Sequence, residues 1–221
     1  MFENIFKWLD ERLGLEEIYG VVLDRKVPKV NWWFTLGSAS LFLFVMQGIT
    51  GIFLTMYYVP DPEKAYDSIE YIMTGLQFGW LIRGIHHWGA TLMVLVVFLH
   101  MLRTFFYAAY KYPREMTWLT GVLLLLLTLG MGFTGYLLPW NQRAYWATTV
   151  GTEIAGAVPP YSVGEFILKV LRGGTDLSAL TLTRFFSAHI WIFPSALAAL
   201  IGVHMYLIIR LGISNIPKED E

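Results

Sequence analysis

The stretch FGWLIRGIHHWGATLMVLVVFLHM, residues 78–101, is the most informative part of this chain. It is apolar for long enough to cross a bilayer as one helix. His86 and His100 lie fourteen positions apart in it, and a second apolar stretch carries His189 and His204, fifteen positions apart. Either spacing covers about 21 Å, or about four turns, of helix. The sequence therefore predicts two helices that each present two histidines at two depths.

The composition is that of an integral membrane protein. Of the 221 residues, 56% are hydrophobic and only 15% are charged, against about 25% charged in soluble domains. The net charge of −1 provides no basic surface for nucleic acid. The absence of cysteine excludes disulfides, iron–sulfur ligation by this chain and a thioether-linked haem.

Four apolar stretches are long enough to span a membrane, which predicts an all-α bundle of four transmembrane helices. The predicted spans are residues 32–58, 80–107, 116–138 and 185–211. Residues 1–30 form an amphipathic segment expected to lie on the membrane surface. Residues 139–184 are too long for a passive connection and are expected to hold local helices. Residues 212–221 are a C-terminal tail.

Lysine and arginine gather in the N-terminal segment and in the turn between the second and third spans, whereas the connection after the first span is acidic. The positive-inside rule therefore predicts a cytoplasmic N-terminus. The second and fourth spans then run in the same direction. His86 and His189 fall toward the outer face, and His100 and His204 fall toward the inner face.

Glycines repeat the histidine spacing in the other two spans. Gly37 and Gly51 lie fourteen positions apart in the first span, and Gly121 and Gly135 have the same spacing in the third. Glycine lets backbone approach the flat face of a macrocycle. Because these spans run opposite to the histidine spans, Gly51 and Gly135 fall at the outer depth. The pattern predicts two haems, each with two imidazoles and two glycines. An iron with two imidazoles has no open position, which favours electron transfer.

Each of these residue types also has a purely structural interpretation. A membrane histidine can be a polar contact between helices, and small residues can serve helix packing. Arg83 and Arg184 lie where they could pair with propionates of the outer haem, and Arg103 and Arg114 offer cations at the inner face. These arginines could instead snorkel to the interface or reflect the positive-inside bias.

The stretch GYLLPWNQRAYW, residues 135–146, leaves the third span on the outer side. Its aromatic residues could form an interfacial belt or one wall of a quinone pocket beside the outer haem. The pocket interpretation suits the segment because it follows directly on Gly135. The candidate wall residues are Tyr136, Trp140, Arg143 and Tyr145.

Four motifs together resemble the N-terminal, haem-binding half of cytochrome b, in the split form of cytochrome b6. They are FGWLIRGIHHWGA (78–90), KYPREMTWLTG (111–121), GYLLPWNQ (135–142) and TLTRFFSAH (181–189). The resemblance implies two haem b groups, with His86 and His189 on the outer iron and His100 and His204 on the inner iron. It implies a quinol–cytochrome c or quinol–plastocyanin oxidoreductase that works by a Q cycle and moves protons across the membrane.

The resemblance also implies partners. They are a separate subunit that supplies the C-terminal half of cytochrome b, a Rieske iron–sulfur protein, a c-type cytochrome and quinone, in a homodimeric complex surrounded by lipid. The expected location is a bacterial inner membrane, with a thylakoid membrane as the alternative. Thr35 stands where the b6 type has a cysteine that attaches a further haem. A third haem at the inner quinone site would therefore have to bind without a covalent bond.

Two other functions are kept as alternatives. The chain could be a di-haem cytochrome b anchor that links a peripheral dehydrogenase or reductase to the quinone pool, without a Q cycle. It could also be a structural bundle whose histidines are polar contacts. Neighbouring genes for a Rieske protein and for a second cytochrome b subunit would distinguish the Q-cycle function from the membrane anchor. Two reversible haem redox waves would exclude the structural bundle.

Overall fold

The structure, a computed structural model, describes residues 2–13 and 31–213. The chain divides into two compact units, Met1–Phe34 and Thr35–Glu221. In the first unit, helix α1 (Phe2–Leu13) confirms that the N-terminal segment is helical over these residues. The guanidinium of Arg12 lies 4.3 Å from the ring centre of Trp8. Residues 14–30 of the predicted segment lie outside the described residues, and the position of α1 on a membrane surface stays a prediction.

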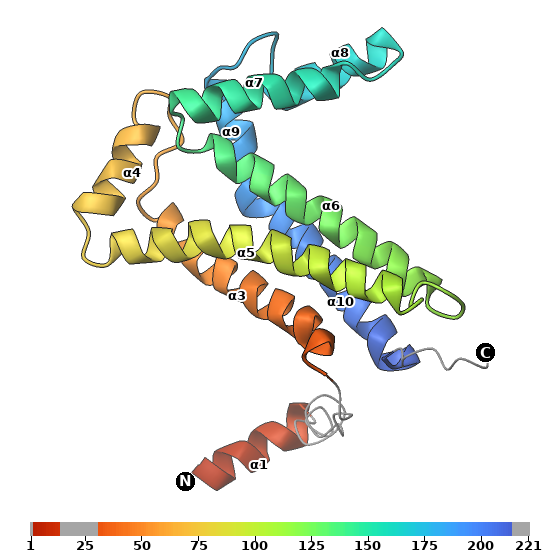
Figure 1. The fold of residues 1–221 in the computed structure, drawn as a ribbon. Helices are drawn as coiled ribbons and strands as arrows, with labels where there is room; N and C mark the ends of the chain where they lie inside the picture. Colours follow the sequence, from red (N-terminus) through yellow and green to blue (C-terminus); the bar gives the residue numbers. More distant parts are fainter. Residues whose placement is uncertain (1, 14–30, 214–221) are drawn as a thin grey trace. The chain divides into compact units, whose positions relative to one another are not determined.

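The four predicted transmembrane helices are present (Figure 1), and apart from residues 32–34 at the start of the first they belong to the second unit. The fourth is continuous through three segments, α9, a π-helical turn η2 and α10, and the first begins with a 3₁₀ turn, η1. Their bounds are η1 Trp32–Thr35, α3 Leu36–Thr55, α5 Gly79–Phe106, α6 Glu115–Leu137, α9 Ala179–Ser187, η2 Ala188–Ile192 and α10 Phe193–Leu211. The prediction of an all-α bundle with four membrane spans is confirmed.

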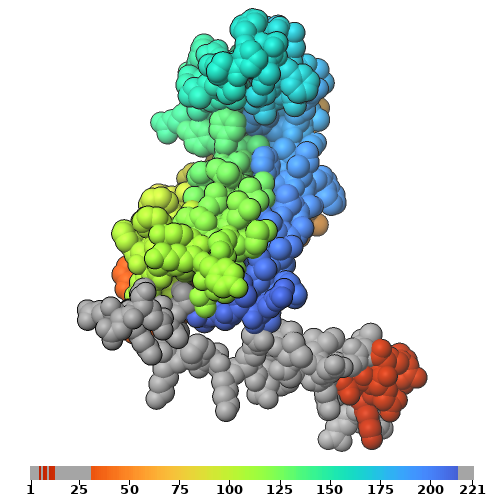
Figure 2. All heavy atoms as spheres, turned by 90° about the vertical axis from the view of Figure 1, so that its right-hand side faces the viewer, coloured from red at the N-terminus to blue at the C-terminus, as the bar shows by residue number. Residues whose placement is uncertain are grey.

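The four helices pack as two pairs. α3 lies along α5, α6 lies along α10, and α5 contacts α6 between the pairs. Leu43, Met93 and Val97 form a small buried cluster between α3 and α5, against which Leu125 of α6 packs. Figure 2 shows α6 and α10 side by side. Most other large apolar side chains of the helices are exposed, as expected where lipid or partner subunits cover them.

The two ends of the bundle differ. At the long-connection end, residues 56–78 contain α4 (Ala65–Thr74), and residues 138–178 contain α7 (Gln142–Gly156) and α8 (Tyr161–Arg172). At the short-turn end, residues 107–114 join α5 to α6. Figure 1 shows α7 and α8 beyond the end of α6 that lies far from this short turn.

The structure departs most from the sequence prediction at two places, the start of the fourth span and the connection after the first span. The local helices expected in 139–184 are present, but the fourth long helix begins at Ala179 rather than at residue 185. The reason is a capping box, in which the side chains of Ser178 and Thr181 satisfy free N–H groups of the first turn. α4 was not predicted, because its ten residues are too few for a span and include Asp67 and Glu70, so they do not stand out from the acidic connection around them.

A buried arginine organises the long connection. Arg172 donates to the Thr152 hydroxyl at 2.8 Å, to the Thr149 carbonyl at 3.0 Å and to the Thr175 carbonyl at 2.9 Å. The Thr181 hydroxyl in turn donates to the Arg172 carbonyl at 2.6 Å. These bonds connect α7 and α8 to the start of α9, the first segment of the fourth long helix.

Tyr58 connects three of the four spans at this end. It lies just after α3, and its hydroxyl donates to the Leu138 carbonyl at 2.7 Å, just after α6. Its ring lies 5.4 Å from the ring of Phe186 in α9, centre to centre. One side chain thus ties the ends of α3 and α6 to the first segment of the fourth long helix.

Candidate functional site

The structure brings His86 of α5 and His189 of η2 together between the two helix pairs. Their ring centres lie 6.2 Å apart, with the ring planes at 74°. Two imidazoles that bind one metal atom through nitrogen, with bonds of about 2 Å, have ring centres no more than about 6 Å apart. The pair is therefore spaced to accept a single iron between the rings.

His100 and His204 occupy the equivalent positions toward the short-turn end. His100 follows His86 by fourteen positions on α5, and His204 of α10 follows His189 by fifteen. α5 and the fourth long helix both run from the long-connection end to the short-turn end. The two second histidines thus lie at a common depth, about 21 Å along the helices from the first pair.

Each predicted glycine lies against one histidine of the expected depth. A Cβ atom built on the glycine would approach the histidine Cε1 at 3.4 Å for Gly51 and His86, 2.6 Å for Gly135 and His189, 3.2 Å for Gly37 and His100, and 3.5 Å for Gly121 and His204. The contact is with the imidazole ring, whereas the sequence argument invoked the face of a macrocycle. The glycines thus let α3 and α6 close on the histidine helices, and their contact with haem stays a prediction.

Three of the four imidazoles are hydrogen-bonded through Nδ1 to a buried threonine. The distances are 2.9 Å from His86 to Thr50, 2.8 Å from His204 to Thr120 and 3.2 Å from His189 to Thr134. His189 Nδ1 also lies 3.1 Å from the Met131 carbonyl. Sequence reasoning missed these threonines. The sequence does contain a signal for them, because each of the three threonines immediately precedes a predicted glycine.

His100 is the exception. Its Nδ1 is buried and has no hydrogen-bond partner among the described residues. The residue before its glycine is Leu36, which has no polar side-chain atom. The two histidine pairs therefore differ in how their rings are held.

The π-helical turn η2 explains the unequal histidine spacings. Phe193 N–H donates to the carbonyl of Ala188, five residues earlier rather than four. Such a turn accommodates one extra residue. The rest of the helix therefore avoids the rotation of about 100° that an added residue would otherwise cause. His189 and His204 thus lie on the same face of their helix, as His86 and His100 do on α5, although their spacing is one residue longer. The signal in the sequence was the extra residue together with Pro194, which cannot donate within the helix.

The predicted arginines near the long-connection end contact other parts of the protein. Arg83 Nη1 lies 3.5 Å from the Met73 sulfur at the end of α4. Arg184 donates to the carbonyls of Lys169 and Val170, which are in the last turn of α8. A cation is favourable there because free carbonyl groups point out of the helix end. The role of both residues toward a propionate stays a prediction.

The two arginines at the short-turn end are also held by the protein. Arg103 is buried, with its guanidinium 4.9 Å from the ring centre of Tyr107. Arg114 donates to the Leu211 carbonyl at 3.4 Å, which connects the start of α6 to the end of α10. Their predicted contacts with the inner haem are likewise untested by this geometry.

The candidate quinol wall forms the corner between α6 and α7. Trp140 adopts a left-handed backbone conformation, with φ of 50°, and its ring lies 5.9 Å from that of Tyr145. The Asn141 side chain then caps α7 by accepting from Ala144 N–H at 2.9 Å. Tyr136 and Arg143 are exposed at this corner. The corner brings Trp140 and Tyr145 together, and its role in binding quinol stays a prediction.

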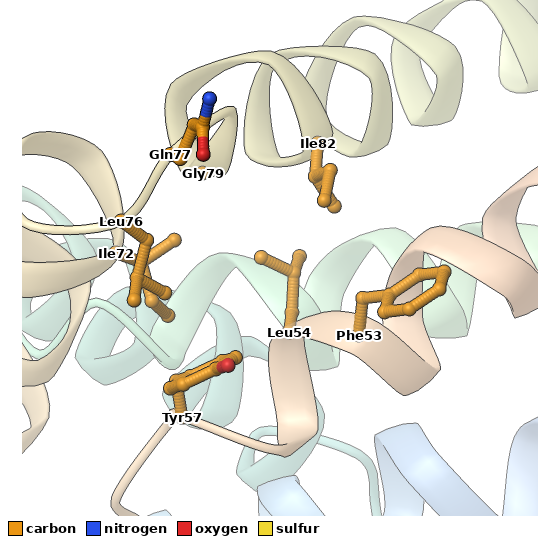
Figure 3. Close-up of a pocket in the computed structure, with 8 residues that line it drawn as sticks. All are labelled: Phe53, Leu54, Tyr57, Ile72, Leu76, Gln77, Gly79 and Ile82. Carbon is orange, nitrogen blue, oxygen red and sulfur yellow. The ribbon is translucent and has the colours of Figure 1, made fainter.

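A separate apolar pocket of about 300 Å³ lies where α3, α4 and α5 meet (Figure 3). Its lining includes Phe53 and Tyr57 near the end of α3, Ile72 of α4 and Ile82 of α5. At its edge, a Cβ on Gly79 would collide with the Ile72 carbonyl, so glycine is required there. None of the four histidines lines this pocket.

Comparisons with known proteins agree with the geometry. Residues 22–212 match the family model Cytochrome b/b6/petB. The chain is 44% identical to the menaquinol:cytochrome c reductase cytochrome b subunit of Geobacillus thermodenitrificans, over 97% of this chain and 99% of that protein. It is 41% identical to cytochrome b6 of Prochlorococcus marinus (strain MIT 9515), over 96% of this chain and 97% of the relative.

A solved structure described as a hyperthermophilic respiratory Complex III shares the fold, with a TM-score of 0.87 and 36% identity. The alignment covers 97% of this chain and 58% of the other, so this chain corresponds to about half of that protein. The family match extends over all four histidines and all four glycines. The chain belongs to the cytochrome b/b6 family.

Proposed function

We propose that this chain is the di-haem b electron-transfer subunit of a quinol–cytochrome c or quinol–plastocyanin oxidoreductase. It carries electrons from quinol oxidation at the outer face to quinone reduction at the inner face, as part of a Q cycle that translocates protons. The observation that carries the proposal is the 6.2 Å separation of the His86 and His189 rings between two membrane helix pairs.

The residues present fit haem b. A haem b with two imidazole ligands supplies a reversible one-electron couple and has no open iron position. His86 and His189 would hold one group, and His100 and His204 the other. The adjacent glycines leave each ring free of a clashing Cβ. The two histidine pairs are separated by about 21 Å along the helices, so they would place two electron carriers in series.

The proposed partners follow from the same family match. They are a subunit with the C-terminal half of cytochrome b, a Rieske iron–sulfur protein and a c-type cytochrome, in a dimeric complex. The relative from Geobacillus thermodenitrificans is named a menaquinol:cytochrome c reductase subunit, which supports a quinol as the electron donor. A bacterial inner membrane with the N-terminus in the cytoplasm is the proposed setting.

Purification of the native complex from membranes tests the proposal. A pyridine haemochrome assay should give two haem b per chain, and a redox titration should resolve two reversible waves. A ratio of three would indicate a further haem held non-covalently near Thr35. Absence of a Soret band would contradict the proposal.

The subunits that co-purify distinguish the proposal from the membrane-anchor alternative. The proposal predicts a Rieske protein and a second cytochrome b subunit, identified by mass spectrometry. A peripheral dehydrogenase or reductase in their place would show that the chain serves as its anchor.

A further inference from the structure

We propose that Thr50, Thr120 and Thr134 are positioning residues that set the tautomer and orientation of three of the four haem-ligand histidines. This inference rests on the proposed function, because it assigns a role toward the haem iron. The fourth ligand, His100, lacks an equivalent partner among the described residues. The two haems would therefore receive unequal support from the protein, two threonines at the long-connection end and one at the short-turn end.

The direction of each hydrogen bond follows from counting protons. A threonine hydroxyl has a single hydrogen to donate. Thr50 has the Met46 carbonyl at 2.7 Å, Thr120 the Thr117 carbonyl at 2.9 Å and Thr134 the Gly130 carbonyl at 2.9 Å. A carbonyl can only accept, whereas the imidazole Nδ1 can carry a proton of its own, so all three groups are satisfied when the hydroxyl hydrogen goes to the backbone carbonyl. The hydroxyl oxygen must then accept, and the imidazole Nδ1 must carry the donated proton.

His189 gives an independent reason for the same tautomer. Its Nδ1 lies 3.1 Å from the Met131 carbonyl as well as 3.2 Å from the Thr134 hydroxyl. Both groups act as acceptors, so Nδ1 carries the proton. In a neutral imidazole the other nitrogen, Nε2, then has the free lone pair and is the one able to bind a metal.

The threonine and the glycine act as a pair of adjacent residues. Gly51, Gly121 and Gly135 admit the imidazole edge against the helix backbone. The threonine one position earlier is turned by about 100° around the helix and reaches the ring nitrogen. All three threonines are buried, with at most 7% of their surface exposed, so solvent does not compete for the bond. At His100 the corresponding pair is Leu36 and Gly37.

The consequence is electronic as well as geometric. An acceptor on Nδ1–H makes Nε2 a more basic ligand and fixes the ring orientation. A more basic ligand stabilises the oxidised iron more than the reduced iron. Removal of one acceptor should therefore raise the midpoint potential of the haem that the histidine binds. The difference in threonine number acts to lower the potential of the haem at the long-connection end.

Valine substitution in the intact complex tests this, because valine keeps the shape of threonine and removes the hydroxyl. Thr50→Val should raise the potential of the His86–His189 haem alone, and Thr120→Val that of the other haem alone. In every variant a backbone carbonyl remains near the imidazole, that of Gln47 for His86, of Thr117 for His204 and of Met131 for His189, so each shift in potential reports the loss of the threonine hydroxyl alone. The altered haem should also show changed g values in the electron paramagnetic resonance spectrum of its ferric form.

Thr128→Val is the matched control. Thr128 is equally buried on α6, its hydroxyl donates to the Leu124 carbonyl at 2.8 Å, and no hydrogen bond to a histidine is found for it among the described residues. Its substitution should leave both potentials unchanged. Serine at positions 50 and 120 should restore the wild-type potentials. If a valine variant fails to assemble, the alanine variant replaces it, since it also lacks the acceptor.

Unshifted potentials in Thr50→Val and Thr120→Val, or an equal shift in Thr128→Val, would overturn the inference. These outcomes differ from failure of the proposed function, which would already appear in the wild-type complex as the absence of two haem b groups.

Discussion

The two ends of the helix bundle hold the same histidine–glycine arrangement in different surroundings. At the long-connection end, α4, α7 and α8 surround the helix ends, Tyr58 joins three spans, and both imidazoles have a threonine partner. At the short-turn end the brief connection 107–114 suffices, and only His204 has such a partner. The spacing of histidines and glycines thus sets the two depths at which paired histidines lie. The residues around that spacing distinguish one site from the other.

The sharpest test of this difference uses one added methyl group at each end. In Gly135→Ala the new Cβ would lie 2.6 Å from His189 Cε1, and the ring is held by Thr134 and Met131, so it cannot easily move. Such overpacking costs about 1–3 kcal/mol, and we expect haem loss at the His86–His189 pair. In Gly121→Ala the distance is 3.5 Å, an ordinary contact, and both haems should remain.

Haem content per chain and the number of redox waves measure the outcome. Equal haem loss in the two alanine variants would show that the glycines do not act through their neighbouring imidazoles.

A one-residue deletion tests whether the π-helical turn compensates for the longer histidine spacing. Deletion of Ile192 makes the spacing on the fourth helix equal to that on α5 and should convert the turn to α-helix, so both haems are retained. Deletion of Leu95 leaves α5 without such a turn to absorb it, rotates His100 by about 100° relative to His86, and should remove the haem at the short-turn end. Both deleted residues are exposed, at 64% and 53%. Optical spectra of the two complexes report how many haems remain. Loss of a haem in the Ile192 deletion would contradict this explanation.

The sequence predicted the four spans, and the structure places the glycines beside the histidines of the expected depth. The spans and the depths of these residues both follow from patterns within single apolar helices, because the number of residues between two positions gives their distance along the helix. The threonine bonds, the π-helical turn and the Arg172 network depend on contacts between helices, which periodicity does not contain. The early start of α9 depended on a local cap at Ser178, and α4 was missed because its pattern is too polar for a span.

A smaller effect, on stability rather than on haem content, is expected from Arg172 in the connection between α6 and α9. Arg172→Met removes several hydrogen bonds of a buried guanidinium and leaves the Thr149 and Thr175 carbonyls without their donor, which should cost about 2–4 kcal/mol. Lys169→Met, one turn earlier on α8, removes only an exposed ion pair with Glu165 and should lower the melting temperature much less, because exposed ion pairs contribute little to stability. Thermal denaturation of the detergent-solubilised complex measures both, and similar melting temperatures for the two variants would show that Arg172 does not organise this region.

The most direct test of the account is the pair of variants His100→Ala and His86→Ala, each compared with wild type by redox titration of the haem absorbance. His100→Ala should remove the haem at the short-turn end and leave the wave of the other haem. His86→Ala should do the reverse, so that each variant lacks the wave that the other retains. Survival of both haems in either variant, or loss of the same wave in both, would contradict the pairing of His86 with His189 and of His100 with His204.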